Sequence, residues 1–209
     1  MADAAFAGRQ VAGAYRGLRG WIDTVDRLGE LKRVSGAHWD VEMGAVTHML
    51  TEKSGGTAPA ILFDDVPGYR KGFRTLYGQL SSVNRIALTL GLPLQHQRKV
   101  DIVQRYHARM QDLRPLPPRY VNDGPIFENV IEGDAVDVLK FPVPRHHEHD
   151  KARFIGTADC VVTKDPDSGG TISAPIAAKS MTARLSVARS PRASTAAFTA
   201  TNILPAANR

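Results

Sequence analysis

Five consecutive residues near the middle of the chain have metal-binding side chains: His146, His147, Glu148, His149 and Asp150. In an extended segment His147 and His149 point to the same side, so both rings can reach one Zn²⁺, which takes imidazole nitrogen at about 2.0 Å. No third ligand at a fixed spacing accompanies them. Two histidines at i and i+2 are a weak signal. The sequence therefore favours an exposed or structural loop over a metal site.

Two other reactive residues lie in an apolar, strand-like run. A carboxylate in a half-buried strand is costly unless it is paired or lines a cavity, and we favour a paired structural role for Asp159. Cys160 is the only cysteine, so no internal disulfide can form, which fits a reducing compartment. Beside two valines it is expected to be a small buried side chain rather than a nucleophile.

Motifs for two common enzyme classes are missing from the sequence. It contains no glycine-rich phosphate loop of the G-x-x-x-x-G-K-[ST] type and no G-x-S-x-G nucleophile elbow. Nucleotide-binding and hydrolase functions therefore have no specific support.

The part of the chain that precedes these residues is expected to form a mainly helical region. Asp40 is expected to cap one of its helices and either Ser81 or Ser82 another, because their side chains can accept the free amide hydrogens of a first turn. The last helix is expected to be polar on its outer face. Apolar spacing predicts helices over residues 16–28, 41–54, 82–90 and 99–113, and strands over 30–34 and 60–63.

A proline cluster at Pro115, Pro117 and Pro118 separates this region from the next, because proline ends helices and stiffens connectors. We place an N-terminal domain at residues 10–113 and a second unit at 119–170. The second unit begins as β structure, with strands expected over 126–131 and 153–163. Residues 171–209 contain eleven alanines and no Asp or Glu, and we expect them to be disordered.

The net charge of +6 comes from the end of the chain. Residues 171–209 hold five basic residues, which leaves 22 basic against 21 acidic residues in the first 170. A nearly neutral body predicts no nucleic-acid partner. The first residues have neither a basic nor an apolar leader region, and no window is apolar enough to span a membrane. We expect a cytoplasmic protein without a transmembrane segment.

Several runs resemble the UbiD-type decarboxylases. They are LRGWI at 18–22, LGEL at 28–31, PAILFDDVPG at 59–68, NRIAL at 84–88, LGLP at 90–93 and, most specific, PVPRHHEHDKARFIGTADCVVTKDPDSGG at 142–170. The resemblance covers about residues 15–170. It implies an α+β protein: an N-terminal α/β domain, then the first strands of an incomplete split β-barrel that binds flavin, then the disordered tail.

The resemblance also implies an activity. UbiD-type enzymes, of which the 3-octaprenyl-4-hydroxybenzoate carboxy-lyases of ubiquinone biosynthesis are one type, reversibly decarboxylate aromatic or α,β-unsaturated acids. They use prenylated FMN with Mn²⁺ and often K⁺, a flavin prenyltransferase supplies the cofactor, and the intact proteins are homo-oligomers. The flavin accepts the charge left as CO₂ departs. Thr157, in the run Ile155-Gly156-Thr157, is the one cofactor contact that the resemblance carries over.

The chain departs from the family after residue 170. The family continues with a motif like Asn-Leu-Gly-Thr-Tyr-Arg, whose Asn binds the metal and whose Arg faces the substrate, whereas residues 171–176 read TISAPI. With permitted codons, a one-base shift near residues 169–171 restores this motif and then Pro-Gly-Lys-His-Gly. We interpret the chain as a truncated family member with an out-of-frame tail, inactive as written and binding neither flavin nor metal. The alternative is a non-catalytic binding or assembly module with a basic tail.

Overall fold

The computed structural model describes residues 15–55, 57–94, 98–114, 121–164, 167, 171–180 and 185–187, and for residues 126, 158–164, 171–180 and 185–187 it describes the backbone. The chain forms two compact units. The first comprises Met1–Ala37 and Ala45–Val130, and the second comprises His38–Gly44 and Ile131–Arg209. Both helices and strands are present, so the predicted α+β class is confirmed.

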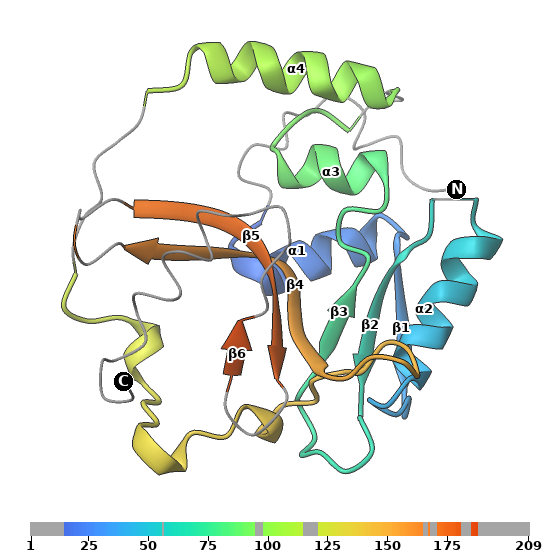
Figure 1. The fold of residues 1–209 in the computed structure, drawn as a ribbon. Coiled ribbons are helices and arrows are strands. Elements are labelled where there is room, and N and C mark those ends of the chain that lie inside the picture. Colours follow the sequence, from blue (N-terminus) through green and yellow to red (C-terminus); the bar gives the residue numbers. More distant parts are fainter. Residues whose placement is uncertain are drawn as a thin grey trace. The chain divides into compact units, whose positions relative to one another are not determined.

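The first unit is built on a small mixed sheet with strand order β1-β2-β3. Strand β1 (Leu31–Ser35) runs parallel to β2 (Ala60–Asp64), and β3 (Thr75–Tyr77) runs antiparallel to β2 (Figure 1). Residues 60–63 of β2 are all buried, as expected for a central strand that is apolar on both faces. The strands predicted at 30–34 and 60–63 are therefore confirmed.

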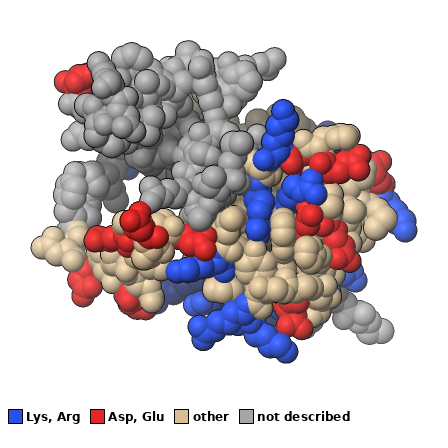
Figure 2. All heavy atoms as spheres, turned by 60° about the horizontal axis from the view of Figure 1, so that its bottom comes forward, with Lys and Arg blue, Asp and Glu red and all other residues tan. Residues whose placement is uncertain are grey.

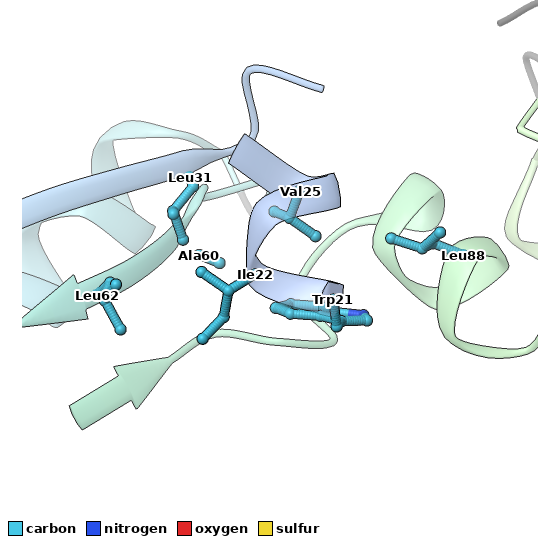
Figure 3. Packing of buried hydrophobic residues seen from close by; sticks show 7 residues of the cluster. All are labelled: Trp21, Ile22, Val25, Leu31, Ala60, Leu62 and Leu88. Carbon is cyan, nitrogen blue, oxygen red and sulfur yellow. The ribbon is translucent and has the colours of Figure 1, made fainter. Parts of the chain in front are cut away.

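Helix α1 (Gly17–Arg27) supplies much of the core of the first unit. Its buried side chains Trp21, Ile22 and Val25 face the sheet, as Figure 3 shows. Gly29 adopts a φ of +72°, the left-handed conformation expected of a C-terminal glycine cap. The cluster consists of Trp21, Ile22, Val25, Leu31, Ala60, Leu62 and Leu88.

A buried arginine ties several segments of this unit together. Arg85, in α3 (Val83–Thr89), is fully buried. Its guanidinium donates hydrogen bonds to the carbonyl oxygens of Ala58 at 2.6 Å and Gly78 at 3.1 Å, and to the Glu30 carboxylate at 2.9 Å. A buried charge is tolerated when it is paired and hydrogen-bonded in this way.

Two of the predicted helices in this unit agree with the structure to different degrees. Of the two expected caps, Ser82 is the one that caps α3, because its hydroxyl accepts the Arg85 amide hydrogen at 3.1 Å. Helix α4 (Lys99–Gln111) forms where a helix was predicted, but the expected polar outer face is wrong. Ile102 is the one buried α4 side chain, and the apolar residues that follow it are exposed.

Helix α2 (Glu42–Lys53) begins differently from the prediction. The Asp40 side chain does not cap it, because this carboxylate accepts a hydrogen bond from Arg145 instead. The Glu42 carboxylate accepts the His38 amide hydrogen at 2.7 Å. Val41 has a φ of +61°, which is rare for a β-branched residue, and its amide hydrogen is donated to the Arg145 carbonyl at 2.9 Å.

The strand predicted over 126–131 is wrong. A 3-10 turn at Pro125–Phe127 takes its place, followed by further 3-10 turns at Gly133–Ala135 and Val138–Lys140. Proline has no amide hydrogen for a strand ladder and fixes φ near the value of a first helical turn. Alternating apolar residues therefore did not produce a strand here.

The second unit contains an antiparallel sheet with order β4-β5-β6. Strand β4 (Arg153–Lys164) pairs with β5 (Thr171–Ser180), which pairs with β6 (Leu185–Val187) (Figure 1). The strand predicted at 153–163 is confirmed. The expectation that the chain is disordered from residue 171 is wrong for β5 and β6, because the backbone groups of β5 pair with the long strand β4. The proline cluster and the rest of the tail lie outside the described residues, and closure into a barrel stays a prediction.

Candidate functional site

Residues 38–44 lie within the second unit, against the segment that leads into β4. Asp40 and Arg145 form a parallel β-bridge, and the Arg145 amide hydrogen is donated to the Trp39 carbonyl at 3.1 Å. The Arg145 Nε atom also donates to the Asp40 carboxylate at 2.5 Å. This hydrogen bond lowers the pKa of Asp40, and the same contact raises the pKa of Arg145. Asp40 is therefore ionised at neutral pH.

A second contact holds the same two segments together. The Arg153 guanidinium lies over the Trp39 ring, 3.8 Å from its centroid, which is cation–π geometry. Its Nε atom donates to the Val143 carbonyl at 2.6 Å. Arg153 is the first residue of β4, so these contacts fix where the strand begins.

The backbone of this segment passes very close to Gly44. A Cβ atom on Gly44 would lie 2.1 Å from the His146 carbonyl oxygen, a distance that no side chain can adopt. The His146 ring is half-buried against Phe154, with ring centroids 5.1 Å apart. Burial lowers the pKa of His146, although the charge of Asp150 opposes this effect. His146 is therefore a packed, neutral side chain at neutral pH.

The other members of the histidine cluster form an exposed turn. The Asp150 carboxylate accepts the His147 amide hydrogen at 3.0 Å and lies 3.5 Å from its Nδ1 atom. The His149 ring is 93% exposed and lies 3.3 Å from the Glu148 carboxylate. Across the part of the chain that the structure describes, no group of three His, Cys, Asp or Glu side chains can hold a metal ion.

Thr157, the expected cofactor contact, is exposed on β4. The β4–β5 ladder shifts register on both sides of Gly156: Gly156 pairs with Ala178, and the next registered pair is Asp159 with Ile176. Thr157 thus lies in an irregularity of the ladder, and such β-bulges change the direction in which a side chain points. The role of Thr157 as a cofactor contact stays a prediction.

The other two candidates lie further along the same strand. The backbone of Asp159 pairs with Ile176, and that of Cys160 pairs with Pro175. Their side chains lie outside the described part of the structure, so the expected structural roles stay predictions.

Two further observations concern the surface and the helices. On the face drawn in Figure 2, Lys and Arg side chains of the described residues lie among Asp and Glu side chains. Of the helices that the structure describes, none has the length and apolar character to cross a membrane.

The residues that organise this region are largely ones that the sequence did not single out. Trp39, Arg145 and Arg153 received no individual role, and Asp40 was expected to cap a helix. Asp40 and Arg145 are 105 positions apart, so no local spacing could have revealed their pairing. The apolar run that follows Arg153 indicated β4 itself.

Comparison with protein families gives two consecutive matches. Residues 22–105 match the 3-octaprenyl-4-hydroxybenzoate carboxy-lyase N-terminal domain, and residues 119–176 match the Rift-related domain of the same enzymes. The chain belongs to the UbiD family. Its first match is to the N-terminal domain of that family, and the chain spans about a third of the length of the curated relatives it matches.

Two curated relatives are decarboxylases by name. The chain is 37% identical over 160 residues to the pyrrole-2-carboxylic acid decarboxylase of Pseudomonas aeruginosa, covering 72% of this chain and 31% of the relative. It is 31% identical over 155 residues to the phenolic acid decarboxylase of a Streptomyces species, covering 74% of this chain and 32% of the relative.

Solved structures show the same relation. The vanillic acid decarboxylase of Sedimentibacter hydroxybenzoicus in its open form matches with a TM-score of 0.68 and 25% identity, over 83% of this chain and 37% of that one. The UbiD-class enzyme HmfF of Pelotomaculum thermopropionicum, solved in complex with FMN, matches with a TM-score of 0.65 and 26% identity, over 84% of this chain and 37% of that one.

The described residues give different support to the two cofactors of the family, flavin and Mn²⁺. Thr157 places an exposed hydroxyl at the β4 irregularity, and a hydroxyl there can hydrogen-bond to a flavin. Among the described residues no group of three His, Cys, Asp or Glu side chains could hold Mn²⁺, so a metal site stays a prediction of the family resemblance.

Proposed function

We propose that this chain is the N-terminal part of a reversible decarboxylase that acts on aromatic or α,β-unsaturated carboxylic acids with prenylated FMN. The 37% identity over 160 residues to the pyrrole-2-carboxylic acid decarboxylase carries this proposal. Pyrrole-2-carboxylic acid is accordingly the first substrate to test. When bound, the modified flavin supplies the electron sink for the departing CO₂.

The contribution of the described residues is to bind and position. Thr157 would donate its hydroxyl hydrogen to the flavin from the β4 irregularity. The Asp40–Arg145 pair and the Arg153–Trp39 contact would hold the beginning of β4 and so the position of Thr157. The contacts around residues 38–44 and 143–153 support these positioning roles.

We further propose that the 209 residues as given do not decarboxylate. Residues 171–176 read TISAPI, without the Asn and Arg that the family resemblance implies for metal and substrate. A one-base frame shift near residues 169–171 accounts for this departure. The gene should therefore be sequenced across the codons for residues 165–209.

The assay compares two proteins: the chain as given, and the product of the frame-restored gene. Each is supplied with prenylated FMN, Mn²⁺ and pyrrole-2-carboxylic acid, and CO₂ release is measured. Release by the frame-restored protein alone supports both proposals. Release by the chain as given refutes the proposed inactivity, and failure of the frame-restored protein on pyrrole-2-carboxylic, phenolic and vanillic acids refutes the decarboxylase proposal.

Thr157 can be tested separately in the frame-restored protein. Thr157→Ala is expected to weaken flavin binding about tenfold, the typical loss for one hydrogen bond of roughly 1.4 kcal/mol, as measured by flavin fluorescence. Thr51→Ala, on the exposed surface of α2, is the matched control and is expected to bind flavin unchanged. Equal affinities in the two variants would remove Thr157 from the binding site.

A further inference from the structure

Val41 has a backbone conformation that a valine rarely adopts. It lies in residues 38–44, here called the strap, and its φ is +61°. The left-handed region disfavours a residue with a Cβ atom by roughly tenfold in population, and a β-branched residue is a clear outlier there. The other described residues with positive φ are nine glycines and Asp65, whose residue types tolerate this region better.

The contacts that impose this conformation come from one residue, Arg145. The Val41 amide hydrogen is donated to the Arg145 carbonyl at 2.9 Å, and the Arg145 amide hydrogen is donated to the Trp39 carbonyl at 3.1 Å. The Arg145 guanidinium adds the hydrogen bond to the Asp40 carboxylate. Strained backbone persists only where surrounding contacts impose it in this way. Docking of the strap on Arg145 is therefore opposed by the strain of Val41.

The docked strap in turn holds the beginning of β4. The Trp39 ring lies beneath the guanidinium of Arg153, the first residue of that strand. Further along β4 the ladder with β5 shifts register on both sides of Gly156, so β5 holds this stretch less regularly than the rest of the strand. Thr157 lies in the same stretch. Its position therefore depends on how firmly the strap is docked.

We propose that docking of the strap and binding of a flavin at Thr157 favour each other. This inference rests on the proposed function, because it takes Thr157 as a flavin contact. The strain of Val41 keeps an undocked state populated, and the docked state holds β4 where the Thr157 hydroxyl can donate to the flavin. Coupling of two sites is reciprocal, so the factor by which flavin favours docking equals the factor by which docking raises flavin affinity.

The strain is tested first in the 209-residue chain without flavin. Amide hydrogen exchange is measured by NMR at Arg145, because its amide hydrogen is released from the Trp39 carbonyl when the strap undocks. Val41→Asn and Val41→Gly suit the left-handed region and are expected to slow this exchange by about threefold or more. Val41→Ile keeps the β-branch and is the matched control, expected to change exchange by less than about twofold.

The coupling is tested in the frame-restored protein with FMN as the probe. Saturating FMN is expected to slow exchange of the Arg145 amide by about tenfold. In flavin fluorescence titrations Trp39→Leu, which removes the ring beneath Arg153, should weaken FMN binding several-fold, and Val41→Asn should strengthen it. Thr51→Ala, on the exposed surface of α2, is the control and should alter neither FMN affinity nor Arg145 exchange. Circular dichroism checks that each variant is folded.

Three outcomes would overturn the proposal, and they are distinguishable. Exchange at Arg145 that bound FMN leaves unchanged would remove the coupling while the flavin site stands. Faster exchange in both Val41→Asn and Val41→Gly than in the wild-type chain would show that strain does not oppose docking. Failure of the frame-restored protein to bind FMN at all would reject the flavin site of the proposed function together with the coupling.

Discussion

The Arg85 guanidinium lies 2.9 Å from the Glu30 carboxylate, with the arginine side chain 1% and the glutamate side chain 20% exposed. Glu30 immediately precedes β1, and Arg85 lies 55 positions later in α3. The Ser82 hydroxyl and the Asn84 amide also donate to this carboxylate. One carboxylate thus joins the first strand to the beginning of α3.

Removing the arginine should therefore destabilise the first unit. Arg85→Met leaves the Glu30 charge without its cation and the carbonyl groups of Ala58 and Gly78 without their donor. We expect a loss of about 3 to 5 kcal/mol in the free energy of unfolding, measured by urea denaturation. Arg19→Met, on the exposed face of α1, is the control and should change stability by less than about 0.5 kcal/mol. Equal effects of the two variants would contradict this role.

Gly44 gives a steric prediction for the second unit. A Cβ atom there would lie 2.1 Å from the His146 oxygen and 2.8 Å from its carbonyl carbon, and backbone atoms cannot rotate away as a side chain can. Gly44→Ala should lower the free energy of unfolding by about 1 to 3 kcal/mol. Gly124→Ala, where a Cβ atom meets nothing within 4 Å, should be tolerated. Urea denaturation of both variants measures the difference, and an unaffected Gly44→Ala protein would show that the close approach is absent.

The Asp40–Arg145 pair predicts a pH dependence. The hydrogen bond from Arg145 lowers the pKa of Asp40 in the folded protein, so its stabilising contribution is complete above the unfolded pKa of about 3.9. The contribution is lost as the pH falls through the lower, folded value. The stability difference between the wild-type protein and Asp40→Asn should therefore shrink below about pH 4.

The measurement is a set of urea denaturation curves for both proteins between about pH 2.5 and pH 7. The same Asp40→Asn change is also made in an Arg145→Gln background, where the pair is already broken. There the difference should be smaller and should depend less on pH. A stability difference that stays constant with pH in the wild-type background would show that the pair contributes nothing.

Local patterns predicted most of the first unit. The apolar spacing of Ile22 and Val25 predicted α1, the uninterrupted run at residues 60–63 predicted β2, and the serines at 81 and 82 predicted the start of α3. These features depend on neighbours within a few residues of each other. Their success follows from the agreement between local propensity and burial.

Contact between distant segments explains two of the failures, and a proline beside the expected strand explains a third. Asp40 has the type and position of a helix cap, but Arg145 competes for its carboxylate from 105 positions away. Apolar residues in 126–131 indicated a strand, but Pro125 begins a 3-10 turn there instead. Residues 171–180 show no period of their own, yet they form β5 because β4 offers its backbone groups.

The candidate site was predicted in part. The family resemblance drew attention to residues 142–170 and to Thr157. The contacts that hold this region involve Trp39 and Gly44, which come from a distant part of the sequence. A single sequence contains no signal that connects these positions.

The placement of residues 38–44 in the second unit affects how the protein can be divided. The chain enters the first unit, leaves it for seven residues, and returns, so the polypeptide crosses between units more than once. Cleavage in the proline-rich stretch would release a C-terminal fragment without its partner for Arg145 and without the aromatic ring beneath Arg153. Such a fragment should regain its native-like contacts only when the N-terminal fragment is added, as in fragment complementation.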